Sequence, residues 1–166
     1  MPKIILHTEI NASIDVCFDL SRSIDLHQIS TNQTSERAID GVTTGLIGLN
    51  ETVTWEATHY GITQRLTSKI TAFQRPFYFV DEQQKGAFKL IIHEHKFEQK
   101  HGKTFMEDCF YFESPYGIFG KIFNFLTLEN HLKKLLLKRN EVIKFYAESE
   151  KWKSVLVEKN YAKKSS

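Results

Sequence analysis

The sequence predicts an α+β fold in which one antiparallel sheet is covered by a long C-terminal helix. Apolar and polar residues alternate through most of residues 36–113, the pattern of strands with one buried face. Residues 128–147 instead carry apolar side chains at steps of three and four, which is typical of one buried helix face. A sheet with one apolar face needs a cover, and this helix can supply it. Because no linker or repeat interrupts the 166 residues, we expect a single domain over residues 1–150 and a basic, solvated tail over 151–166.

The N-terminal part should contain one strand and two short helices. The segment KIILHTEI, residues 3–10, is typical of a strand. Asn11 and Ser13 then offer N-cap oxygens to a helix in SIDVCFDLSRS. A second short helix is expected at roughly residues 23–30.

A first hairpin is predicted from ETVTWEATHYG and ITQRLTSKITAF, with Tyr60-Gly61 as a two-residue loop. That loop places Trp55 opposite Leu66 and His59 opposite Ile62. Both apolar faces then fall on the same side of the sheet, which supports this register.

A second hairpin is predicted in HKFEQKHGKTFMEDCF, with His101-Gly102 as the loop. The polar residues on its first strand then face outward. The inward face is mostly apolar but also carries two histidines and one aspartate. The inward pairs are Phe97–Met106, His95–Asp108 and His93–Phe110.

The connection between FYFVDEQQ and AFKLII is ambiguous. A Lys85-Gly86 loop would pair Glu82 with Lys89, but it would turn Phe79 and Ile92 outward. The facing of residues 77–92 therefore stays open.

Two helices are expected in the C-terminal third of the chain. A short helix should begin after Pro115 in SPYGIFGKIFNFL. Thr127 can cap the long helix, LENHLKKLLLKRNEVIKFYAES, which carries the apolar stripe.

Five motifs, in order, resemble those of the START-like (SRPBCC) superfamily, which includes the birch-pollen allergen and polyketide cyclases. They are GVTTGLIGLNETVTWEATHYG, FVDEQQKGAF, HEHKFE, MEDCFYFESPYGIFG and HLKKLLLKRNEVI. They are similar to a small bacterial branch whose members are mostly called ligand-binding or cell-division-inhibitor-like proteins. The resemblance covers about residues 3–147. It implies a helix-grip fold: a curved seven-stranded antiparallel sheet around the long helix, two short helices after strand one, and a ligand cavity.

Several residues match that branch's motifs by position, and one departs from them. Asn50 stands where Gly is often found, and asparagine tolerates left-handed backbone, so the turn is compatible. The matching residues are Trp55, His59, Asp81, Gly86, His93, His95, Phe97, Asp108, Pro115 and Gly120.

The histidines permit three interpretations. His93 and His95, completed by His59 or Asp108, could bind Zn²⁺ or Fe²⁺, but the H-x-H pattern is common and we expect no metal and no cofactor. Oriented by Asp108, His95 could act as a general base in a polyketide cyclase or dehydratase type of enzyme, although no nucleophile signature lies nearby. The favoured interpretation is a buried polar cluster that orients a ligand's polar group. The carboxylate favours protonated His95 and burial opposes it, so the direction of its pKa shift stays open.

The favoured function is binding of a small, mostly apolar molecule in a cavity between the sheet and the C-terminal helix. Small inward residues, Ala57, Ser68 and Ala72, leave space among large neighbours. The alternatives are the cyclase-like enzyme and a protein-interaction adaptor with a filled cavity. The expected ligand-binding residues are Trp55, His59, Leu66, His93, His95, Phe97, Asp108 and Phe110.

Composition narrows the partners and the compartment. A formal net charge of +2 provides no strong field for nucleic acid, so no nucleic-acid partner is expected. Cys17 and Cys109 cannot form a disulfide framework. The N-terminal MPKIILHTEI is too short and too soon polar for a signal peptide, and no apolar run approaches the ~18 residues of a membrane span. We therefore expect a cytoplasmic monomer or weak homodimer.

Overall fold

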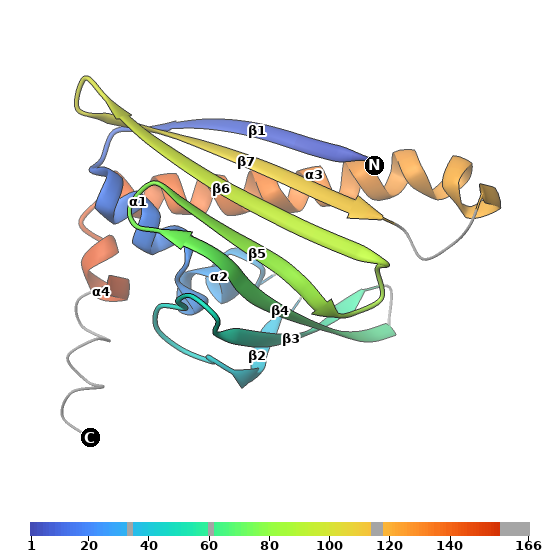
Figure 1. Ribbon diagram of the computed structural model, residues 1–166. Coiled ribbons are helices and arrows are strands. Elements are labelled where there is room, and N and C mark those ends of the chain that lie inside the picture. Colours follow the sequence, from blue (N-terminus) through green and yellow to red (C-terminus); the bar gives the residue numbers. More distant parts are fainter. Residues whose placement is uncertain (33–34, 60–61, 114–117, 157–166) are drawn as a thin grey trace.

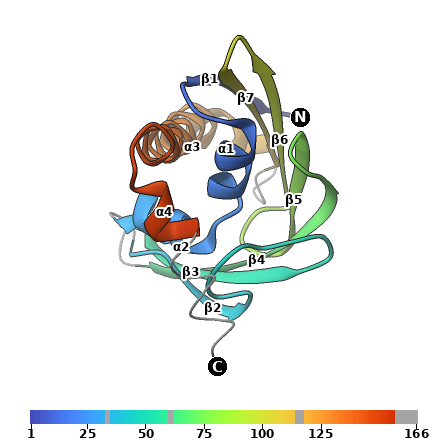
Figure 2. The same cartoon turned by 90° about the vertical axis from the view of Figure 1, so that its left-hand side faces the viewer.

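The computed structural model describes residues 1–32, 35–59, 62–113 and 118–156, and within them a curved antiparallel sheet lies against the helices (Figure 1). The strand order is β1-β7-β6-β5-β4-β3-β2. Viewed from one end, the sheet curves around α1 and one side of α3 (Figure 2). The strands are β1 (Lys3–Ile10), β2 (Arg37–Gly41), β3 (Thr52–His59), β4 (Ile62–Gln74), β5 (Tyr78–Lys85), β6 (Leu90–Lys100) and β7 (Lys103–Glu113). The helices are α1 (Ile14–Ser21), α2 (Ile24–Ser30), α3 (Ile118–Ala147) and α4 (Trp152–Leu156).

The two short helices after β1 are capped by serines. Ser13 Oγ accepts the backbone N–H of Val16 over 3.4 Å, and Ser23 Oγ accepts that of Leu26 over 3.2 Å. Asn11, the other predicted cap, instead donates its backbone N–H to Glu148 Oε1 over 2.8 Å. The strand at residues 3–10 and the helix near residues 23–30 are confirmed.

The registers of both predicted hairpins are confirmed. Trp55 pairs with Leu66 on β3 and β4, although the loop residues 60–61 lie outside the described part of the chain. On β6 and β7, His95 pairs with Asp108. His101 and Gly102 have φ of 51° and 78°, which is the backbone that a two-residue turn of type I′ requires.

The connection between β5 and β6 differs from the trial register. Glu82 pairs with Ile92 rather than with Lys89, because the loop spans residues 86–89 instead of two residues. The change moves the pairing by an odd number of positions and so reverses the faces of β5. Phe79 therefore lies inward opposite His95 with 2% of its surface exposed, which settles the facing that the sequence left open.

The C-terminal helices also differ from expectation. One continuous helix, α3, runs from Ile118 to Ala147, so Thr127 lies inside it and does not cap a second helix. An internal threonine costs a helix only a few tenths of a kcal/mol, and neither Pro nor Gly interrupts the chain there. Residues 152–156 do not belong to a solvated tail, because they form α4 and its Val155 is buried in the main core.

Two apolar clusters fill the space between the sheet and the helices. The larger one surrounds Phe18 of α1, whose ring makes edge contacts with Phe73, Phe79 and Phe97. The smaller one joins β1, β6 and β7 to Leu136 of α3. Asn50, in the turn before β3, has φ of 65°, the left-handed conformation that asparagine tolerates.

Candidate functional site

A cavity of about 240 Å³ lies on the inner face of the sheet. Its wall is contributed by strands β3 to β7 and by helices α1, α2 and α3. The space is several times larger than a single water molecule needs. Such a volume is slightly below the ~300 Å³ at which drug-sized ligand sites begin, which limits any occupant to a small molecule.

The cavity wall is mainly apolar, and two of the small residues expected to create space lie on it. Ala57 and Ser68 line the cavity, whereas Ala72 does not. Trp55 is fixed there by His27 of α2, whose ring stacks on it with centroids 4.2 Å apart. The apolar wall includes Trp55, Leu66, Ile91, Phe110, Leu132 and Leu136.

The structure brings together five of the eight residues expected to contact a ligand. Trp55, Leu66, His93, His95 and Phe110 line the cavity. The other three expected residues are not among the described side chains that line the cavity. Phe97 packs in the core against Phe18, Asp108 lies behind the wall with 1% exposure, and the side chain of His59 is outside the described residues.

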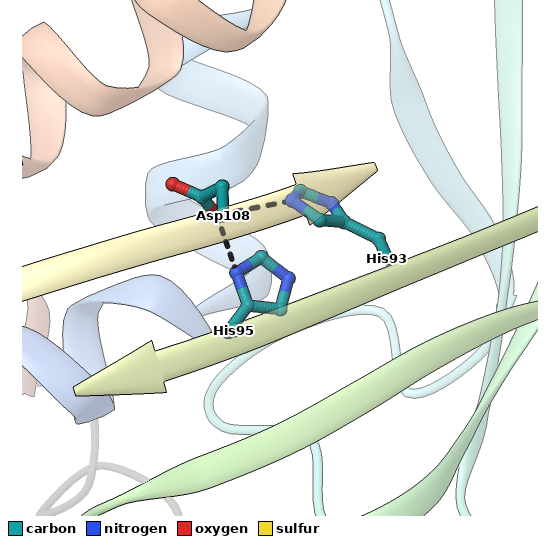
Figure 3. A group of neighbouring side chains, drawn as sticks. All are labelled: His93, His95 and Asp108. Atoms are coloured by element: carbon teal, nitrogen blue, oxygen red, sulfur yellow. Dashed lines mark hydrogen bonds and ion pairs between the residues drawn. The ribbon is translucent and has the colours of Figure 1, made fainter. Parts of the chain in front are cut away.

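Asp108 binds both histidines of the H-x-H motif (Figure 3). His93 Nε2 lies 3.0 Å from Asp108 Oδ1 in a hydrogen bond. His95 Nδ1 lies 2.7 Å from the same oxygen, but outside the direction in which its ring N–H would donate, so this is a close electrostatic contact. His95 also stacks on Phe79 with ring centroids 4.1 Å apart. The predicted contact between His95 and Asp108 on the concave face is therefore present.

Helix α3 supplies further partners for Asp108. Asn140 Nδ2 donates to Asp108 Oδ2 over 2.7 Å and also to Thr8 Oγ1 of β1 over 3.2 Å. Arg139 Nη1 lies 3.9 Å from Asp108 Oδ1. The buried carboxylate is thus held by groups from one strand, β6, and one helix, α3, which compensates for the loss of water around its charge.

Burial and charge shift the pKa values of this cluster in a consistent way. Burial alone would raise the pKa of Asp108, but the hydrogen bond from His93 and the contact with His95 outweigh it and hold the pKa well below its usual range. Burial lowers the pKa of His95 well below its usual value, with repulsion from His93 adding to it and the attraction of Asp108 failing to compensate. The direction that the sequence left open is therefore downward, toward a neutral His95 beside an ionised Asp108.

Asp81 of β5 is a site residue that the predicted ligand set missed. It pairs with His93 across the β5–β6 ladder and lines the cavity. Burial raises its pKa, although the Ser68 hydroxyl and the positive potential of His93 and Arg139 act in the opposite direction. Ser68, Asp81, His93 and Arg139 together form what we call the polar corner of the cavity.

Arg139 and Asn140 were also missed, although the sequence carries a signal for them. They follow Leu136 by three and four positions and precede Ile143 by four and three, so they occupy the apolar face of α3. Both are buried, with 9% and 3% exposure. A polar pair inside an apolar helical stripe indicates a buried partner, which here is Asp108.

A metal ion does not fit this cluster well. Ligand atoms of His93, His95 and Asp108 all lie within 4.8 Å of one another, so the set could in principle hold a cation. The two histidine nitrogens instead contact the carboxylate directly, and the Arg139 guanidinium lies 3.9 Å from the same oxygen. A fixed positive charge so close to a ligand oxygen opposes a second cation.

Comparisons with known proteins identify the fold. No protein-family model matches the chain, and no curated protein matches it. The solved structure of TTHA0849 from Thermus thermophilus is similar at a TM-score of 0.68 and 16% identity, covering 89% of this chain and 100% of that one. The structure of the major latex-like protein 151 of Panax ginseng is similar at a TM-score of 0.66 and 15% identity. That match covers 89% of this chain and 98% of the ginseng chain. The structure of Ara h 8.0201 is similar at a TM-score of 0.65 and 12% identity, covering 88% of this chain and 97% of that one.

These likenesses, at low identity, establish the fold alone. The chain has the helix-grip fold, with the seven-stranded curved sheet and long C-terminal helix that the resemblance implied. In the described residues, no helix is both long and apolar enough to cross a bilayer.

Proposed function

We propose that this protein binds a small, mostly apolar molecule in the cavity, with the polar end of that molecule at the polar corner. The observation that carries the proposal is the cavity itself, about 240 Å³ of space walled by Trp55, Phe110 and aliphatic side chains. Close-packed interiors hold few voids larger than one water, so a space of this size inside a small fold favours an occupant.

The distribution of polar groups supports a ligand with two unlike ends. Most of the wall offers only apolar contact, whereas Ser68, Asp81, His93 and Arg139 converge at the polar corner. A few convergent polar groups in an otherwise apolar pocket are the usual means of orienting a bound molecule.

The experiment uses N-phenyl-1-naphthylamine, a neutral apolar dye whose fluorescence rises out of water. We expect saturable binding by the purified protein. Ala57→Phe should weaken it at least about tenfold, because a phenyl group at Ala57, a small residue on the cavity wall, occupies the ligand's space. A thermal melt of the variant verifies that it is folded.

Thr58→Phe is the matched control. Thr58 is adjacent on β3 but exposed on the outer face, so the same added ring should leave dye affinity unchanged. Absence of saturable binding to the wild-type protein, or equal affinities for the wild type and the folded Ala57→Phe variant, would contradict the proposal.

The two other candidate functions have less support. A protein-interaction adaptor was expected to have a filled interior, and the cavity argues against that expectation. A general base acting on a substrate needs contact with it, yet His95 has 1% exposure and a pKa lowered mainly by burial. His93 has more contact with the cavity, at 8% exposure, but one nitrogen is already occupied by Asp108.

A further inference from the structure

Arg139 is a buried cation on the cavity wall whose hydrogen-bonding capacity is only partly used. Its residue exposure is 9%. Nη2 donates to the backbone oxygen of Ser21 over 2.5 Å. Nη1 is buried and makes no hydrogen bond to any residue that the structure describes. A buried guanidinium donor without a protein acceptor favours an additional acceptor from a bound molecule.

The other two arginines on the wall are already paired. Arg22 donates from Nε to Asp19 over 2.8 Å, and Arg65 donates from Nε to Glu56 over 2.9 Å. Arg139 has no such carboxylate hydrogen bond within the described ranges, since Asp108 is 3.9 Å away. Arg139 is therefore the arginine of this wall that is available to an incoming anion.

The neighbouring acids do not remove that availability. Asp108 already accepts one hydrogen bond at each oxygen, from His93 and from Asn140, and its Oδ1 lies 3.9 Å from Arg139 Nη1, beyond hydrogen-bond distance. Burial raises the pKa of Asp81, so its carboxyl is a weaker competitor for the guanidinium than an ordinary aspartate would be. Within the polar corner, Arg139 is thus the group with an unused donor, because the Ser68 hydroxyl is already hydrogen-bonded to Asp81 and the His93 ring to Asp108.

We propose that the cavity ligand is an amphiphilic monocarboxylate and that Arg139 binds its carboxylate. This inference rests on the proposed binding function and specifies the ligand's class. Arginine presents paired donors that match the two oxygens of a carboxylate. Asp108 lies 3.9 Å from the single guanidinium and already opposes part of its charge, so a ligand with one negative charge is repelled less here than a phosphate monoester with two. The apolar wall accommodates the rest of the molecule.

The test compares octanoate with 1-octanol as competitors that displace N-phenyl-1-naphthylamine at pH 7.5. The two share an apolar chain and differ in the charged end. A purely apolar cavity would prefer the less hydrated alcohol. We expect the wild-type protein instead to bind octanoate at least about tenfold more tightly, the effect of one charge-assisted hydrogen bond. Arg139→Gln should reverse the preference, so that 1-octanol competes better.

Two further variants make the result specific. Arg37→Gln removes the same charge from an exposed arginine of β2 that is paired with Glu56 and does not line the cavity, and it should retain the octanoate preference. Arg139→Lys keeps the positive charge but lacks the paired donors of the guanidinium. It should still prefer octanoate, by a smaller factor than the wild-type protein. If a thermal melt shows that Arg139→Gln does not fold, the inference is tested by the ratio of octanoate affinity to 1-octanol affinity in the wild-type protein and in Arg139→Lys.

The outcomes separate the two proposals. If the dye does not bind the wild-type protein, the binding function fails and this inference fails with it. If the dye binds but 1-octanol competes as well as octanoate, or folded Arg139→Gln keeps the wild-type preference, the carboxylate inference alone is overturned. Octanoate preference that is lost in Arg139→Gln and kept in Arg37→Gln supports it.

Discussion

The side-chain amide of Asn140 donates a 2.7 Å hydrogen bond to Oδ2 of Asp108 and so joins α3 to β7 through a buried polar contact. Asp108 has 1% exposure and Asn140 has 3%, so neither group can exchange this partner for water in the folded state. The position of α3 over the sheet is therefore specified by a polar contact as well as by apolar packing.

Asp108→Ala should destabilise the fold. The substitution leaves His93 and Asn140 without their shared acceptor and removes the carboxylate that contacts His95, and an unsatisfied buried polar group costs about 1–3 kcal/mol. Urea denaturation measures the free energy of unfolding of the variant and of the wild-type protein. The control is Glu107→Ala, one position along β7 on the outer face, which should change stability by less than about 0.5 kcal/mol.

A double-mutant cycle tests the contact itself. Asn140→Ala alone should cost about 1–2 kcal/mol, and in the Asp108→Ala background it should cost at least about 0.5 kcal/mol less, because the contact is already absent. Glu141→Ala, on the exposed face of α3, should show no such coupling. Strict additivity of the Asp108 and Asn140 substitutions would show that the hydrogen bond contributes nothing.

Acidification should reduce stability through His95. Its pKa is lowered in the folded protein, mainly by burial, whereas the unfolded chain takes up a proton near pH 6.5. Below that pH the unfolded state binds more protons, so the stabilisation is complete above about pH 6.5 and is lost as the pH falls. Asp108, with its lowered pKa, acts in the same direction only below about pH 3.9, whereas Asp81, with its raised pKa, acts in the opposite direction.

The measurement compares free energies of unfolding at pH 7.0 and 5.5. His95→Gln should reduce the loss between these two values by about 1 kcal/mol, since one titrating group contributes at most ~1.4 kcal/mol per pH unit. Parallel profiles for wild type and His95→Gln would refute the prediction.

Gly102→Ala should destabilise the β6–β7 hairpin for conformational reasons alone. Gly102 has φ of 78°, and an added Cβ would meet no atom within 4 Å. The cost is therefore that of a left-handed alanine, about 1–2 kcal/mol. Gly48→Ala is a fitting comparison, because that glycine is not at positive φ and its added Cβ meets only Glu51 at 3.4 Å. Equal melting temperatures for the two variants would argue against the tight turn.

Val155→Ala should show that α4 belongs to the folded unit. Val155 has 6% exposure within the main core, and removing its methyl groups should cost about 2 kcal/mol from lost burial and the remaining cavity. Lys153→Ala, at an exposed position of the same helix, should be close to neutral. A neutral Val155→Ala would instead fit the solvated tail that the sequence suggested.

Whether the facing of a site residue could be predicted depended on the length of the adjacent loop. The two-residue turn at His101-Gly102 fixed the parity of both strands, so the pairing of His95 with Asp108 could be predicted from alternation alone. The loop between β5 and β6 has no such signature, and one residue more or less reverses the face of Asp81. Asp81 was therefore absent from the predicted ligand set although it faces the same cavity.

The helix contributions could be predicted only in part. Spacing identified the apolar stripe of α3, but a stripe does not say what a polar residue within it will meet, and Arg139 and Asn140 find their partner on a strand about 30 residues away in sequence. The continuity of α3 through Thr127 was also not evident, because a residue able to cap a helix is tolerated inside one.

The pairing of β1 with β7 has a consequence for how the chain is made. Lys3 to Ile10 find their ladder partners only between Thr104 and Tyr111, so about 90 residues must be synthesised after β1 before it can join the sheet. At ~5–20 residues per second, the ribosome needs roughly 5–20 s for that interval. Ile4, Leu6 and Ile10, all buried in the finished protein, stay open to solvent and to other nascent chains meanwhile. The N-terminal strand is thus a segment on which holding chaperones would act during translation.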